Sequence, residues 1–321
     1  MTQKYHIDGT EEFGYNSVNR FLYSFYMYKN TVKRITSMYN CASVHDLKGY
    51  VAHFCYLRLK SFDTFVKVVL NNKDFLAANC ILRMLGDSVA VFKLIYTEKD
   101  VHLLVLRHCL YVIDGCERNL KVLTDDNADN SCLPDTELEM LRKKTQYNRE
   151  LRNRLMSDAK EMLESSPLRF RDKAAFDKIV EDRNWKFKEF KNYKKKSANQ
   201  YQWKELYKLL DIRSDCDVLS FISQYTHGLS MSNLVMTMNP ENIDAIVGAA
   251  LSLIRRLHKY TLSYFSKEQL YILEGLIEPK MRNEILSCYD EEHRPDGSSW
   301  NNQVMNQISQ LRFNGLCQIK L

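Results

Sequence analysis

Apolar residues recur along most of the chain at the three- and four-residue spacing that marks one face of an amphipathic helix. This pattern predicts an all-α multi-helix bundle of about eight to ten helices. The expected helices cover residues 11–40, 47–57, 73–96, 97–123, 136–165, 171–182, 203–212, 217–227 and 240–257, and another begins near 266. The chain has only 10 Gly and 5 Pro, so we expect short connections rather than the many turns of a β fold.

Two of these helices have clear start signals. Ser43-x-x-Asp46 and Thr97-x-x-Asp100 resemble capping boxes, in which a side-chain oxygen accepts a hydrogen bond from the first turn. The signals fall where the apolar periodicity begins, so the two kinds of pattern predict the same helix starts.

The clearest break in the pattern is a polar segment at residues 124–135. We interpret it as a linker between an N-terminal helical half, 1–123, and a C-terminal half, 136–290, which is followed by a tail, 291–321. The expected helix at 136–165 is highly charged and its apolar stripe is narrow. We therefore expect much of this helix to lie in solvent or to pair with one neighbour, which also allows a homo-oligomer.

Sequence patterns for secretion and membrane insertion are missing. The first residues lack the apolar core of a signal peptide, and the most apolar stretch, Ala245–Ile254, is too short to cross a bilayer. The 9 Cys have no regular spacing, which favours reduced thiols in a cytoplasmic protein. Sequence motifs for phosphate loops, zinc sites and nucleophile elbows are absent, so we expect no cofactor and no metal.

The positive charge is concentrated in residues 183–196. The net charge is +6, and outside this segment acidic and basic residues are equal in number. The candidate polyanion-binding residues are Trp185, Lys186, Lys188, Lys191, Lys194, Lys195 and Lys196. Lysines neutralise phosphates and aromatic rings stack on unpaired bases, so the segment suits nucleic acid, with an acidic protein or an anionic membrane as alternatives. It could equally be an amphipathic helix with a solvated lysine face.

Two polar pairs lie on otherwise apolar predicted helices. Arg83 and Asp87 are one turn apart, and a guanidinium is costly to bury without a carboxylate, so we predict a buried ion pair. Ser223 and His227 are also one turn apart, with Tyr225 between them. A histidine near a hydroxyl can be held in one tautomer and offer its other nitrogen to a partner. Alternatively, these residues form a buried polar network that fixes helix packing.

The stretches 83–87 and 223–228 together resemble the two signature regions of an uncharacterised bacterial all-helical family. That family has Arg-x-x-x-Glu on one helix and a Tyr or Ser shortly before a His on another. The similarity covers about residues 70–260, and Asp87 stands where the family has Glu. The resemblance implies a helical fold and a shared polar centre.

Two classes of function are consistent with these patterns. The first is a cytoplasmic helical protein that acts through protein or polyanion contacts, for example in a bacterial defence or stress response. The second is an RNA- or nucleotide-directed hydrolase in which His227 is the general acid–base. In that hydrolase Arg83 would stabilise an anion and Asp87 would orient Arg83, with Ser223 and Tyr225 in support. The second class requires Arg83 and His227 to line one cleft that solvent can reach.

Overall fold

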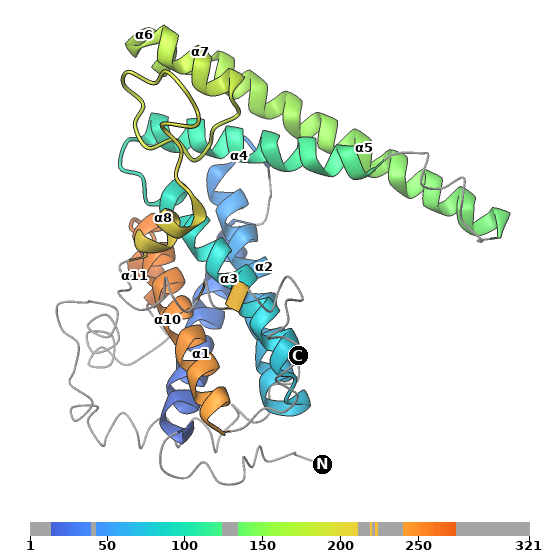
Figure 1. Cartoon of the computed structure of the whole chain (residues 1–321), viewed down its shortest axis with the longest axis vertical. Coiled ribbons are helices and arrows are strands. Elements are labelled where there is room, and N and C mark those ends of the chain that lie inside the picture. The colour runs from blue at the N-terminus through green and yellow to red at the C-terminus, as the bar shows by residue number, and fades with distance from the viewer. Residues whose placement is uncertain are drawn as a thin grey trace. The chain divides into compact units, whose positions relative to one another are not determined.

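The all-α fold predicted from the sequence is confirmed by the computed structural model, which describes residues 14–39, 43–123, 134–210, 219, 222–223 and 240–273 (Figure 1). The helices are α1 (Gly14–Met38), α2 (Leu47–Lys67), α3 (Phe75–Tyr96), α4 (Val101–Val122), α5 (Asp135–Glu164), α6 (Leu168–Arg171), α7 (Lys173–Glu181), α8 (Trp203–Lys208), α10 (Pro240–Tyr264) and α11 (Gln269–Leu273). A short π-helical segment, η1 (Val68–Asn72), continues α2. Within these ranges the only β pairing is an isolated antiparallel bridge between Phe187 and Gln200.

The chain forms two compact units that are interleaved along the sequence. The first unit comprises residues 1–40, 51–93 and 203–321, and the second comprises 41–50 and 94–202. The halves predicted above, 1–123 and 136–290, are consecutive instead. A separation at 124–135 would fall inside the second unit, between α4 and α5.

The first unit has an aromatic core to which α1 and α2 both contribute. Phe21 of α1 lies with its ring centroid 5.7 Å from that of Phe65 of α2, in an edge-on arrangement. Tyr28 of α1 contacts Phe62 of α2 in the same way, at 6.3 Å. These rings are almost fully buried, and aromatic side chains of this size contribute much of the apolar surface that stabilises a core.

Helix α10 packs along α1 and adds a buried polar group to this core. The Nε2 atom of His258 lies 2.8 Å from the hydroxyl oxygen of Thr31, and the imidazole lies edge-on to the Tyr28 ring. Burial lowers the pKa of His258 to about 3, so the imidazole is neutral at physiological pH. A neutral histidine in a hydrogen bond with a hydroxyl satisfies both polar groups inside the core.

The second unit is organised by the pairing of α4 with α5. Helix α4 begins at Val101, one turn after the start predicted from Thr97, because Asp100 is the cap: its carboxylate accepts hydrogen bonds from the backbone amides of His102, at 2.9 Å, and Leu103, at 3.4 Å. On α4, His108 is fully buried, and its Nδ1 lies 3.1 Å from the hydroxyl of Tyr96. The ring of Tyr50 lies edge-on to the same imidazole at 4.6 Å.

Within the described ranges, α3 is long and apolar enough to cross a membrane by length and composition. Half of its most apolar stretch (50%) is buried among the other helices, and core helices commonly have this composition. The charged residues Arg83 and Asp87 interrupt the apolar run of α3, which is why Ala245–Ile254 stands out from the sequence as the most apolar stretch instead.

Candidate polyanion-binding loop and the Arg83 cluster

The basic segment is not a helix, so the amphipathic-helix alternative is wrong. Residues 182–202 form an irregular loop between α7 and α8. Arg183 and Asn192 have left-handed backbone conformations, with φ of 50° and 59°, which a regular α-helix does not accommodate. Trp185, Phe187 and Tyr193 are buried and anchor the loop from within. The loop, called the lysine loop below, is therefore a folded part of the second unit.

Trp185 belongs to the core of the second unit. Its side chain is only 6% exposed, and its indole nitrogen donates a hydrogen bond to Asp114 of α4 at 3.2 Å. Its ring also lies edge-on to that of Tyr111, with centroids 5.1 Å apart. The expected stacking of Trp185 on a base is therefore corrected, because the ring has no face available to a ligand.

Arg107 of α4 fixes the backbone of the loop through hydrogen bonds. Its Nη1 atom donates to the carbonyl oxygen of Phe187 at 2.9 Å and to that of Trp185 at 3.4 Å, and its guanidinium carbon lies 3.9 Å from the Phe187 ring centroid. Burial lowers the pKa of Arg107 to about 10, with Glu98 acting in the opposite direction, so the side chain stays charged at neutral pH. Sequence reasoning missed Arg107, although an arginine on an apolar helix face is the signal that identified Arg83.

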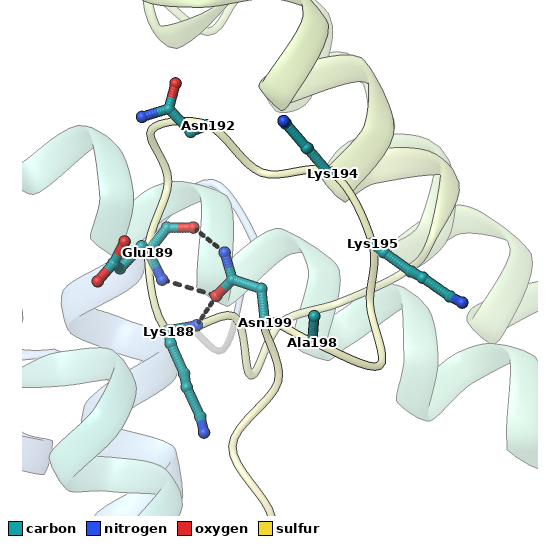
Figure 2. A pocket seen from close by; sticks show the side chains of 7 residues that line it. All are labelled: Lys188, Glu189, Asn192, Lys194, Lys195, Ala198 and Asn199. Atoms are coloured by element: carbon teal, nitrogen blue, oxygen red, sulfur yellow. Dashed lines mark hydrogen bonds between the residues drawn. The ribbon is translucent and has the colours of Figure 1, made fainter.

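Asn199 closes the loop into a ring. Its side-chain oxygen accepts hydrogen bonds from the backbone amides of Lys188 and Glu189, at 2.8 and 2.9 Å, and its amide nitrogen donates to the Glu189 carbonyl at 2.8 Å (Figure 2). Lys196 donates to the backbone carbonyl of Asp182 at 2.7 Å. Of the predicted polyanion-binding lysines, Lys196 thus helps to fix the loop itself.

The ring encloses a pocket of about 350 Å³ that carries most of the exposed lysines of the segment. It is lined by Lys188, Glu189, Asn192, Lys194, Lys195, Ala198 and Asn199. Figure 2 shows the three lysine side chains leaving the ring in different directions, with Lys194 directed toward Asn192. The ammonium groups therefore spread over the loop surface instead of converging on one point. Lys191 is exposed beside them, and Lys186 lies over the Trp185 ring at 5.5 Å.

The predicted ion pair between Arg83 and Asp87 is present, but it is only partly buried. The Arg83 side chain is 15% exposed and the Asp87 side chain 33%. Tyr207 of α8 joins them: its hydroxyl donates to the Asp87 carboxylate, and the guanidinium lies 4.9 Å from its ring centroid. Burial raises the pKa of Tyr207, and the adjacent Asp87 carboxylate raises it further. The three residues form the Arg83 cluster, in which two donors occupy the Asp87 carboxylate.

The second predicted polar region lies largely outside the described residues, and His227 and Tyr225 are among those outside. Ser223 is described and is half-buried in a helical segment. Leu219, which is also helical, lies so close to Gly86 of α3 that a β-carbon there would meet its side chain at 2.5 Å. This contact brings Leu219 against the turn of α3 that bears the Arg83 cluster, while the expected role of His227 stays a prediction.

Comparisons with protein-family models, with curated proteins and with solved structures find no match to this chain. The resemblance described above therefore stays a prediction, and function is argued from the geometry alone.

Proposed function

We propose that this protein is a helical binding protein that contacts the phosphate backbone of a nucleic acid through the lysine loop. The observation that carries the proposal is the ordered ring closed by Asn199, with Lys188, Lys194 and Lys195 around its pocket. Phosphate contacts from lysines supply most of the affinity in sequence-independent nucleic-acid binding.

The direction of the lysine side chains favours an extended polyanion over a single phosphate group. A small anion is held best where several donors converge, whereas the ammonium groups of Lys188, Lys194 and Lys195 are spread over the loop. A nucleic-acid backbone offers phosphates at regular intervals and can meet each lysine separately. The burial of Trp185, Phe187 and Tyr193 argues against base stacking, so we expect binding with little sequence preference.

The internal support of the loop favours binding as well. Arg107 and Asn199 hold the backbone in one conformation before any ligand arrives. A loop that is already ordered loses less conformational entropy on binding, and more of the interaction energy then appears as affinity. The exposed lysines are therefore carried on a loop that its own hydrogen bonds hold in place.

The test compares two triple variants of equal charge. In the first, Lys188, Lys194 and Lys195 are replaced by Gln; in the control, Lys121, Lys160 and Lys173, which are exposed on α4, α5 and α7, are replaced in the same way. Affinity for a short RNA duplex is measured by fluorescence anisotropy across a series of salt concentrations. Each lost phosphate contact should reduce the magnitude of the slope of log K against log salt by about one. The slope should therefore fall by about two to three for the loop variant and stay nearly unchanged for the control.

Equal slopes for the two variants would refute the proposal. Binding to acidic polypeptides or to anionic vesicles, with none to the duplex, would also refute it and would assign the lysines to the alternative partner.

A further inference from the structure

The N-terminal half of α5 carries large apolar side chains in solvent. Met140 is 64% exposed and Tyr147 is 60% exposed. They lie seven residues apart and so share one face of the helix, on which Lys144 lies between them. The buried residues of α5, Ala159 and Leu163, lie roughly 100–160° away around the helix axis, counted at about 100° per residue. The exposed stripe is therefore separate from the face that α5 buries.

The stripe has the spacing of a short coiled-coil seam. Met140 and Tyr147 take the d positions of a heptad, and Lys144 and Leu151 take the a positions. Leu151 is partly exposed, so it is still accessible to another helix. A seam of this kind leaves the water when the seam of a second helix packs on it.

We infer that the stripe pairs with the same stripe of a second copy of this chain, in antiparallel orientation. The pairing is centred between residues 145 and 146. Within the seam, residue 145 of one copy is level with 146 of the second copy, 144 is level with 147, and so on outward. Met140 then faces Leu151 of the second copy, and Lys144 faces Tyr147, whose ring can accept the ammonium group in a cation–π contact. At each end of the seam, Glu137 of one copy faces Arg154 of the other, and the two side chains have opposite charges.

Charge selects this orientation. In a parallel pair, each a and d residue meets its own equivalent, which would set Lys144 against Lys144 in the seam. Beside the seam the pairing is different, because an antiparallel pair brings the g positions of the two helices together. Lys143 of one copy therefore lies beside Glu150 of the other, twice by symmetry. Lys143 contacts Glu139 of its own helix at 3.2 Å, but this exposed pair is weak and leaves Lys143 able to turn to Glu150 of the second copy.

The experiment is a charge exchange read by sedimentation equilibrium of the full chain over a concentration series. Wild type should show a concentration-dependent dimer. Lys143→Glu and Glu150→Lys should each weaken it by about tenfold or more, because two attractive pairs become repulsive. An equimolar mixture of the two variants should recover dimerisation, since each Glu of one copy then faces a Lys of the other. Lys160→Glu, on the same helix but away from the stripe, is the control and should leave the dimer unchanged.

The inference is overturned if wild type is monomeric throughout the series, or if the two variants associate as wild type does. It is also overturned if they associate no better mixed than alone, because the contact would then not bring residues 143 and 150 together. Far-UV circular dichroism should show that each variant keeps its helices, as expected for substitutions at exposed helical positions.

Discussion

Replacing Arg107 with methionine should destabilise the second unit and loosen the lysine loop. Methionine fills much of the space of the arginine stem but donates no hydrogen bond. The substitution leaves the carbonyl oxygens of Phe187 and Trp185 without the donor that reaches them at 2.9 and 3.4 Å. An unsatisfied buried carbonyl costs about 1–3 kcal/mol, and the cation–π contact with Phe187 adds about 2 kcal/mol in a desolvated site.

Part of that loss is offset, because the variant no longer has to remove a charged guanidinium from water when it folds. We therefore expect the free energy of unfolding to fall by about 2–4 kcal/mol. The stability of Arg107→Lys should lie between those of wild type and Arg107→Met. An ammonium group can reach one carbonyl but lacks the flat guanidinium that stacks on the Phe187 ring.

The assay is urea unfolding of the full chain, followed by circular dichroism and by tryptophan fluorescence. Affinity for the RNA duplex is measured in parallel, and it should fall although every lysine is still present. Arg118→Met is a matched control on the same helix, because the Arg118 side chain is 75% exposed and pairs with Asp114 one turn away. A change in unfolding free energy below about 0.5 kcal/mol for Arg107→Met would refute the role assigned to Arg107.

Two further predictions concern the first unit. Arg83→Ala should lower the free energy of unfolding by about 1–3 kcal/mol, less than for a sealed ion pair because Asp87 is partly exposed, and an unchanged melting temperature would contradict this. The pKa of His258 is about 3 when folded and near 6.5 when unfolded, so the unfolded chain takes up a proton first as the pH falls. Stability should therefore decrease below about pH 6.5, by up to about 1.4 kcal/mol per pH unit for this histidine. His258→Gln, which can still bond Thr31, should make urea midpoints between pH 7 and 5 less pH-dependent, and an unaltered slope would refute the burial argument.

Helix positions could be predicted because their determinants are local. The start of α4 depends on Asp100 and the two amides that follow it, and the position of α3 follows from its own apolar periodicity. The ion pair between Arg83 and Asp87 was predictable for the same reason, since both residues lie on one helix one turn apart.

The remainder of both sites depends on residues far apart in the sequence. Tyr207 reaches Asp87 across 120 positions, and Arg107 reaches Phe187 across 80. Residues 183–196 have helix-like spacing of aromatic and basic side chains, yet their conformation is set by contacts with α4 and by two left-handed residues. A local pattern contains no information about such partners, so the aromatic residues were assigned to a ligand when they belong to the core.

The interleaving of the two units limits how this chain can be divided into fragments. The backbone passes between them after residues 40, 50, 93 and 202. A gene segment for 94–202 would encode most of the second unit but would omit Tyr50, whose ring covers the buried imidazole of His108. The second unit is therefore not one continuous segment of the chain. By the same reasoning, a fragment of residues 94–202 alone would expose part of its own core, because the ring that covers His108 would be missing.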